Sequence, residues 1–352
     1  MTLAKKESLV LSRMDSIKGL LTLAVLVYHS ILAWSFSGWH NFSVETFLPF
    51  EYLCHFLLKF HTPAFTFLSG YLFYYLRYEK GKYRTPRQDI PRRAKRLLIP
   101  YGLLLLWVIP FHFLFEGGTV KRAFVKYVLA VAPTQLWFLV MLFGVFVIFY
   151  LISDRLPKRP VVNFLVFYGI YGCATVGAMV LPDYFQIWTI LKSLLYFYFG
   201  YAVRQGLLRK PKKALFYIVM ALAYAALIYV DYKYLSAAAS TKIKMLSAAL
   251  DPITSLIGIA AFVFLFSRLS CVLERSKLFA LIKRYNFTIY LFHQQLVYIP
   301  LRFLPKQTPT ILLAGACVLI ALLGSLGISM VLDCFSVTRT LFGLKTTKMK
   351  SR

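Results

Sequence analysis

Residues 17–36, IKGLLTLAVLVYHSILAWSF, form a run of twenty residues in which only Lys18 and His29 carry an ionic or readily titrated side chain. Twenty mostly apolar residues are the length that an α-helix needs to cross the ~30 Å hydrocarbon core of a bilayer. The chain has 352 residues, 59% of them hydrophobic and only 15% charged, whereas soluble domains carry about 25% charged residues. The sequence therefore predicts an all-α polytopic membrane protein.

Further apolar runs, each bounded by charged residues, turn residues or proline, follow along the whole chain. We expect about ten transmembrane helices, with boundaries good to roughly four residues. No Gly-rich or Pro-rich linker separates them, so we predict a single membrane domain over residues 1–352 and no soluble module. The predicted spans are 17–36, 47–78, 97–115, 136–152, 162–181, 188–203, 214–230, 252–266, 279–299 and 311–335.

Lys and Arg outnumber Asp and Glu by 41 to 13, which leaves a formal net charge of +28. Such an excess is typical of a protein that binds nucleic acid or an anionic membrane surface, and a mean hydropathy of +0.67 argues against nucleic acid. If the connections alternate across the membrane from a cytoplasmic N-terminus, 31 of the 41 basic residues fall on the cytoplasmic side. Because cytoplasmic loops are enriched in Lys and Arg, this bias predicts an even number of spans and two cytoplasmic termini.

The two ionisable residues of the first span are placed in a regular way. Lys18 and His29 are eleven residues apart, so they share one helix face with a rise of about 16.5 Å between them. Ionisable side chains inside the hydrocarbon cost roughly 2.5–3.5 kcal/mol each, which makes them candidates for function. Lys18 can extend to the cytoplasmic surface, whereas His29 lies beyond mid-membrane. The alternative is a packed histidine whose N–H is satisfied near the outer interface.

The second span contains the segment FHTPAFTFLSGY at 60–71, in which His61 precedes Pro63 and Ser69 precedes Gly70. A proline and a glycine so close together can break a membrane helix, and the freed backbone groups are tolerated only where protein or a cavity satisfies them. The segment therefore predicts a cavity wall or, equally, a simple kink that allows tight packing at Ser69 and Gly70.

The connection 77–96 carries nine basic residues and ends in Arg93 and Arg96 just before the third span. If the helix has begun there, their three-residue spacing places both on one face. Paired guanidinium groups suit bidentate binding of phosphate oxygens at a membrane edge. A plain positive-inside anchor that contacts anionic lipid headgroups is the alternative.

Three further polar or aromatic residues lie in the later spans. Trp137 opens the fourth span, where tryptophan is most often an aromatic-belt residue, and Tyr290 and His293 lie within the ninth. His293 is a buried titratable group with no obvious local partner. The five cysteines include no CxxC pair, and the chain has no Walker loop and no HExxH helix, so we expect neither a metal site nor a nucleotide-driven pump.

Five of these segments, in order along the chain, resemble the motifs of the membrane acyltransferase-3 family, whose members O-acylate sugars and surface polysaccharides. Lys18 and His29 are similar to its Arg/Lys-x10-His motif, and 93–96 resembles its RxxR motif. Residues 60–70 resemble its FHMPxFFFLSG segment, with Thr62 in place of the usual Met. Two later signatures resemble 137–139 and 290–293, and the second departs from the pattern because Gln294 follows where Pro is common.

The resemblance implies a ten-helix fold in the plasma membrane and transfer of an acyl group from cytoplasmic acyl-CoA to a hydroxyl of a surface or exported glycan. The stand-alone sugar O-acetylase type implies acetyl-CoA as donor, with succinyl transfer as an alternative, and the acceptor is a glycan or a lipid-linked sugar. A transporter or flippase for a lipid-linked sugar would also need polar groups in the membrane. The two halves of this chain show no internal repeat to support it.

The same resemblance suggests a role for each candidate residue. His29 is the expected general base on the acceptor hydroxyl, or the carrier of the acyl group in an acyl-histidine relay. Asp15 is expected to orient a neighbouring basic residue by ion pairing, and His61 to bind the acceptor or orient His29. The CoA phosphates are expected to bind Lys18, Arg93 and Arg96, and the remaining candidates, which would line the substrate cavity, are Ser69, Trp137, Tyr290 and His293.

Overall fold

The computed structural model describes residues 3–36, 38, 42, 44–82, 85–208, 213–235, 240–305 and 307–344. Within these ranges the regular structure is helical and contains no strand. A long helix lies at each of the predicted spans, and two short helices, α4 Val120–Ala123 and α12 Ser336–Leu341, lie between or after them. The long helices are α1 Leu3–Ile31, α2 Leu48–Tyr74, α3 Pro86–Glu116, α5 Trp137–Ile152, α6 Pro160–Val180, α7 Ile187–Gln205, α8 Ala214–Val230, α9 Thr241–Leu273, α10 Lys277–Phe303 and α11 Thr310–Cys334.

Seven helical segments of the described chain are long and apolar enough to cross a membrane, which makes the protein a multi-pass membrane protein. The count of ten crossings and the cytoplasmic termini stay predictions, because composition alone does not single out α2, α7 and α10. The seven segments are Val10–Trp34, Pro86–Glu116, Thr134–Arg155, Pro160–Val180, Ala214–Tyr234, Lys242–Leu273 and Thr310–Cys334.

The three remaining long helices carry several polar side chains that are buried within the protein. Glu51 and His61 of α2, Ser193 of α7 and Gln294 and Gln295 of α10 are all buried. α2 packs against α1, α7 and α9, while α10 packs against α1 and α11. Their polar groups therefore face neighbouring helices, where such groups are tolerated, and this explains why their composition is less apolar.

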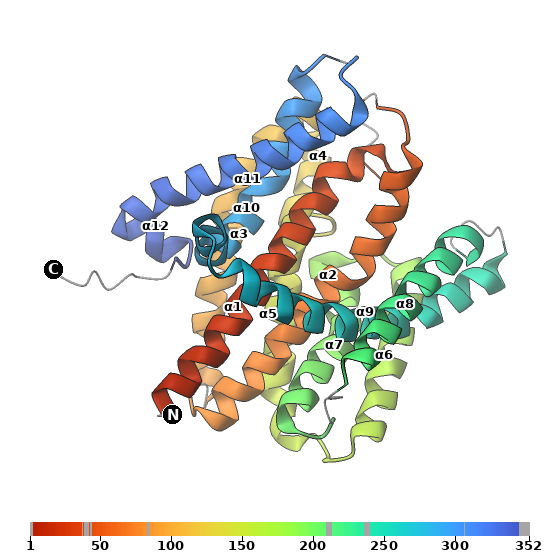
Figure 1. Cartoon of the computed structure of the whole chain (residues 1–352), viewed down its shortest axis with the longest axis vertical. Coiled ribbons are helices and arrows are strands. Elements are labelled where there is room, and N and C mark those ends of the chain that lie inside the picture. The colour runs from red at the N-terminus through yellow and green to blue at the C-terminus, as the bar shows by residue number, and fades with distance from the viewer. Residues whose placement is uncertain are drawn as a thin grey trace.

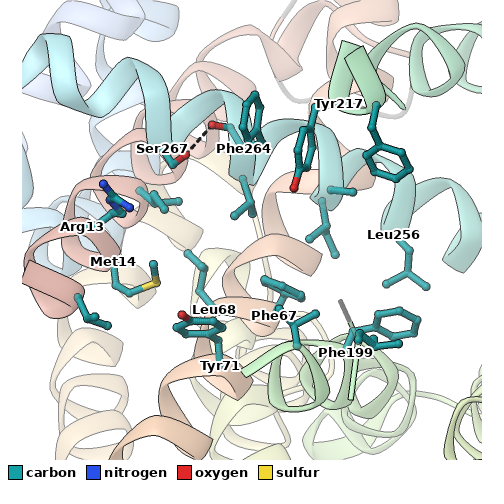
Figure 2. A pocket seen from close by; sticks show the side chains of 18 residues that line it. Arg13, Met14, Phe67, Leu68, Tyr71, Phe199, Tyr217, Leu256, Phe264 and Ser267 are labelled. Carbon is teal, nitrogen blue, oxygen red and sulfur yellow. Dashed lines mark hydrogen bonds between the residues drawn. The ribbon is translucent and has the colours of Figure 1, made fainter. Parts of the chain in front are cut away.

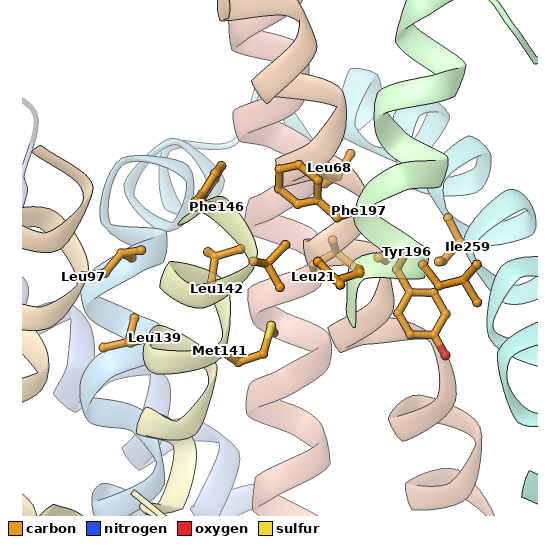
Figure 3. Close-up of a cluster of buried hydrophobic side chains, with 14 of the residues drawn as sticks. Leu21, Leu68, Leu97, Leu139, Met141, Leu142, Phe146, Tyr196, Phe197 and Ile259 are labelled. Carbon is orange, nitrogen blue, oxygen red and sulfur yellow. The ribbon is translucent and has the colours of Figure 1, made fainter. Parts of the chain in front are cut away.

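α1 is the helix around which the others are arranged. It packs against α2, α9, α10 and α11, and Figure 1 shows it in red, running obliquely through the bundle with α8 to its right and α11 to its upper left. Side chains of α1, α2, α3, α5, α7 and α9 meet in one buried apolar cluster, part of which appears in Figure 3. Leu21 of α1, Leu68 of α2, Phe146 of α5 and Phe197 of α7 belong to it.

α2 runs without a break through Pro63 and Gly70, so the prediction of a broken helix is wrong. Gly70 instead allows a close crossing with α7, because a Cβ at this position would lie 2.0 Å from the carbonyl oxygen of Phe197. Gly200 of α7 meets α2 in the same way, where a Cβ would lie 1.8 Å from the carbonyl oxygen of Phe67. The tight-packing alternative therefore describes Gly70, as in small-residue contacts between membrane helices.

Three helices begin well before the predicted spans, and the first is α1, which begins at Leu3 rather than at Ile17. α3 begins at Pro86 and already includes the basic segment 87–96, so Arg93 and Arg96 lie on a formed helix. α9 begins at Thr241, eleven residues before the predicted start at Pro252, which lies inside the helix. Proline is tolerated within membrane helices because neighbouring groups satisfy the freed carbonyl, so it was a poor marker of a helix start.

Candidate functional site

Five predicted site residues from four helices line one cavity of about 160 Å³. The cavity lies among α1, α2, α3, α5 and α10, and we call it the basic cavity. Because three of the five residues are cationic, it is suited to an anionic group at its open end. The five residues are Lys18, Ser69, Arg93, Arg96 and Tyr290.

A second cavity of about 130 Å³ lies farther along α1 and brings together four predicted site residues. We call it the histidine cavity, since both His29 of α1 and His61 of α2 line it. Trp137, at the start of α5, and Tyr290 of α10 complete the predicted set, and Tyr28, Thr62 and Gln135 also line the wall. Among the described residues that line this cavity there is no Lys or Arg.

The two cavities share three aromatic wall residues, Phe65, Phe138 and Tyr290. The ring of Phe138 lies between the other two, with centroid separations of 5.9 Å to Phe65 and 5.8 Å to Tyr290. The cavities therefore meet at an aromatic constriction, which separates Lys18 from His29. This arrangement matches the rise of about 16.5 Å that eleven helical residues give.

His29 is held by a second histidine that is distant in the sequence. The Nδ1 of His293 lies 2.8 Å from the Tyr290 carbonyl oxygen and 3.2 Å from that of Ile289, so Nδ1 carries the proton and Nε2 is an acceptor. His293 Nε2 lies 3.1 Å from His29 Nδ1, which also lies 3.0 Å from the Val25 carbonyl oxygen. His29 therefore donates from Nδ1, and the network assigns its Nε2 as the unprotonated ring nitrogen.

His61 of α2 also lines the histidine cavity. Its ring is 5.1 Å from that of Tyr28, which is in turn 5.0 Å from the ring of His29. His61 Nδ1 contacts the Thr62 hydroxyl at 2.8 Å, and the side chain is buried. Within the described chain its Nε2 has no hydrogen-bond partner, and an unsatisfied buried nitrogen is costly unless a ligand completes it.

The cationic end of the site depends on α3. The guanidinium carbon of Arg93 lies 3.6 Å from the ring centroid of Phe146, so a cation–π contact orients a half-buried side chain. Arg96, one turn farther, is exposed. Asp15 lines neither cavity, and the Ser69 hydroxyl donates to the Phe65 carbonyl oxygen at 2.9 Å. The structure therefore groups nine of the ten candidates around the two cavities, counting His293 through its contact with His29.

Gln135 is a site residue for which the sequence predicted no role. Its side-chain amide donates to the Leu291 carbonyl oxygen and to Gln295 Oε1, both at 2.7 Å, and Gln295 donates back to Gln135 Oε1 at 3.1 Å. The Tyr290 hydroxyl donates to the Gln135 carbonyl oxygen. These bonds fasten the start of α5 to α10. An amide directly before one predicted span and another within a second span were the only signal that could have indicated the pair.

The described residues contain no group of three His, Cys, Asp or Glu side chains placed to hold a metal ion. A family model described as an acyltransferase domain matches residues 11–330. The chain belongs to the acyltransferase-3 family. It is therefore a membrane acyltransferase, and the match covers all ten candidate site residues. No curated protein and no solved structure gave a significant match.

Proposed function

We propose that this membrane acyltransferase moves an acetyl group from cytoplasmic acetyl-CoA to a hydroxyl of a surface or exported glycan, or of its lipid-linked precursor. The observation that carries the proposal is the pair of adjoining cavities. One end holds Lys18, Arg93 and Arg96, and the other end holds two buried histidines. An acyl-CoA has the same division, because a long, slender arm separates its phosphates from its thioester.

The three cations at the basic cavity would bind the phosphates of the donor. Arg93 and Arg96 lie one turn apart on α3, and Lys18 faces them from α1 across the same cavity. Charge-assisted bonds of this kind are roughly twice as strong as neutral ones. The acyl-pantetheine arm would then pass the aromatic constriction and deliver the thioester to His29. Asp15 would orient the cationic group from α1.

The histidine pair fits general-base catalysis. His29 Nε2 takes the proton of the acceptor hydroxyl while the hydroxyl oxygen attacks the thioester carbonyl carbon. The tetrahedral intermediate then collapses, the carbon–sulfur bond breaks, and the departing thiolate takes the proton from His29 Nε2. His293 accepts the Nδ1 hydrogen of His29 throughout, which keeps the ring in the required tautomer and stabilises its cationic form.

His61 and Trp137 would bind the acceptor. His61 Nε2 is buried in the cavity wall and would form a hydrogen bond with a sugar hydroxyl or with the thioester oxygen. Trp137 lines the same cavity and offers an aromatic surface to a sugar ring. Since His29 and His61 line the same cavity, the reacting atoms would lie within reach of both.

The size and polarity of the histidine cavity favour acetyl over succinyl. Its volume is about 130 Å³, and the lining residues that the structure describes offer apolar, aromatic, hydroxyl, amide and imidazole groups but no Lys or Arg. A succinyl carboxylate would enter this cavity without a cationic partner, and an unpaired buried charge is strongly unfavourable. The proposal therefore names acetyl-CoA as the donor.

The proposal is tested by mass spectrometry of the envelope glycan from the host strain with and without the gene. We expect the acetyl substituent to disappear on deletion and to return with the wild-type gene but not with a His29→Ala gene of equal protein abundance. Unchanged substituents on a smaller amount of exported glycan would overturn the proposal in favour of a transporter or flippase. A missing succinyl group would overturn only the choice of donor.

A further inference from the structure

A third cavity lies on the other side of α2 and has a different character. Its volume is about 480 Å³, and it is enclosed by α1, α2, α7, α8 and α9 (Figure 2). Apolar and aromatic side chains form nearly all of its wall, among them Leu68, Phe199, Leu256 and Phe264. We call it the apolar cavity.

α2 separates the apolar cavity from the reaction site. Phe67, Leu68 and Tyr71 line the apolar cavity, whereas Phe65, Ser69 and Leu72 line the basic cavity from a different side of the same helix. Phe65 is the constriction residue on that side, and the fully buried Leu68 fills the space between. The apolar cavity shares no described lining residue with the basic cavity or the histidine cavity, so we treat it as a separate site with a different occupant.

One end of the apolar cavity is cationic. Arg13 of α1 and Ser267 of α9 lie together at this end in Figure 2, while Leu256 and Phe199 lie at the other. Arg13 is exposed, and in the part of the chain that the structure describes no carboxylate forms an ion pair with it. Arg268 follows Ser267 and lies with its guanidinium carbon 5.3 Å from the Phe264 ring centroid. The mouth thus presents positive charge above an apolar interior.

The length of the cavity is that of one lipid chain. Leu256 and Ser267 are eleven residues apart on the continuous helix α9, which gives a rise of about 16.5 Å. Half of the ~30 Å hydrocarbon core of a bilayer is about 15 Å. A cavity with a cationic mouth and an apolar body of this length matches a molecule that carries a phosphate at the end of an acyl chain.

We propose that the apolar cavity binds one acyl chain of an anionic glycerophospholipid, with its phosphate against Arg13. The lipid would come from the leaflet at the N-terminal end of α1. Bound there, it would join the α8–α9 pair to α1 and α2, the helices that carry His29 and His61, and so stabilise the reaction site from behind. The lipid proposal does not rest on the proposed acetyl transfer, because none of the proposed reaction-site residues lines the apolar cavity.

The proposal is tested on delipidated full-length protein in detergent, to which phosphatidylglycerol or phosphatidylcholine is added. Native mass spectrometry and thermal unfolding report binding. We expect phosphatidylglycerol to be retained and to raise the melting temperature more than phosphatidylcholine. The Arg13→Gln change should weaken phosphatidylglycerol binding about fivefold, since one basic residue near an anionic lipid contributes about 1 kcal/mol. Arg87→Gln, at an exposed position of α3 outside the cavity, is the matched control.

A second variant tests the binding of the acyl chain rather than the contact between the lipid phosphate and Arg13. Ala260→Trp fills the cavity and should abolish lipid retention, whereas Leu222→Trp on the exposed face of α8 should not. The His29→Ala protein should bind lipid like the wild type, which separates this test from that of the proposed function. Equal binding of both lipids, unchanged by Arg13→Gln, would overturn the proposal. The proposal would also be overturned if inorganic phosphate raised the melting temperature as much as phosphatidylglycerol does. That result would show a site for the anion alone, with no contribution from an acyl chain.

Discussion

The two faces of α2 line cavities of opposite character. On one face, Phe65 and Ser69 border two small cavities with three cations and two histidines in their walls. On the other face, Phe67 and Leu68 border a cavity of about 480 Å³ whose wall is nearly all apolar. Polar groups are costly inside a membrane, so they are concentrated where chemistry requires them, and the apolar side is suited to the bilayer's own components.

The comparison predicts that a substitution in the histidine cavity causes the largest loss of activity. His29→Ala removes the proposed base and should lower acetyl transfer by about 10²–10⁴-fold, the usual contribution of general-base catalysis. Transfer from acetyl-CoA by the reconstituted protein measures it. His55→Ala is the matched control, because His55 of α2 lines neither cavity of the site. Its Nε2 lies 3.7 Å from Glu51 Oε1 instead. Normal transfer by His29→Ala at normal abundance would refute the assignment.

The basic cavity should affect donor binding more than catalysis. Arg93→Ala and Arg96→Ala each remove a charge-assisted contact, which contributes about 1.5–3 kcal/mol, so KM for acetyl-CoA should rise about tenfold or more. Lys95→Ala is the control, since Lys95 is an exposed cation between the two arginines and does not line the cavity. If all three changes had the same effect, a diffuse basic surface for lipid headgroups would replace the phosphate site.

His293 should have an intermediate effect, through its contact with His29. His293→Phe removes the acceptor of the His29 Nδ1 hydrogen and should lower kcat about tenfold, the value of one good hydrogen bond, while KM for acetyl-CoA is unchanged. His293→Gln supplies a side-chain oxygen and should restore part of the rate. A packing role would instead make the two variants equally slow, and a thermal melt of each variant checks that both are folded.

The sequence predicted those features that depend on spacing within one helix. Apolar runs located the long helices, and the eleven-residue interval of Lys18 and His29 placed them at the two ends of the site. Contacts between helices were a different matter. His29 and His293 are 264 positions apart, and no periodicity indicates which helices become neighbours. Their pairing required the packing of α1 against α10.

The role of a residue was equally hard to predict where its type is common in membrane helices or can have several structural roles. Pro63 suggested a break, yet α2 continues through it, since proline is tolerated within membrane helices. The apolar cavity had no sequence signal at all. Apart from Arg13 and Ser267, its wall consists of apolar and aromatic residues, which are abundant along a chain that is 59% hydrophobic and 17% aromatic. Only their placement around a common space distinguishes them.

The smallest effect is expected at the constriction, and it tests whether the two small cavities form one path. Phe138→Ala removes the ring that lies between Phe65 and Tyr290 and should widen the passage between Lys18 and His29. Because the ring takes no part in the chemistry, acetyl transfer should change only a few-fold. Water should reach the thioester more easily, so hydrolysis of acetyl-CoA without acceptor should rise, and a thiol-release assay measures it.

Phe143→Ala is the matched control on α5, because Phe143 lies five residues farther along the helix and lines neither cavity. It should leave both hydrolysis and transfer unchanged. The combination of faster hydrolysis with nearly normal transfer for Phe138→Ala alone would show that the donor passes this point. If neither rate changed, the thioester would reach His29 by another route, and the two cavities would lie side by side without forming one path.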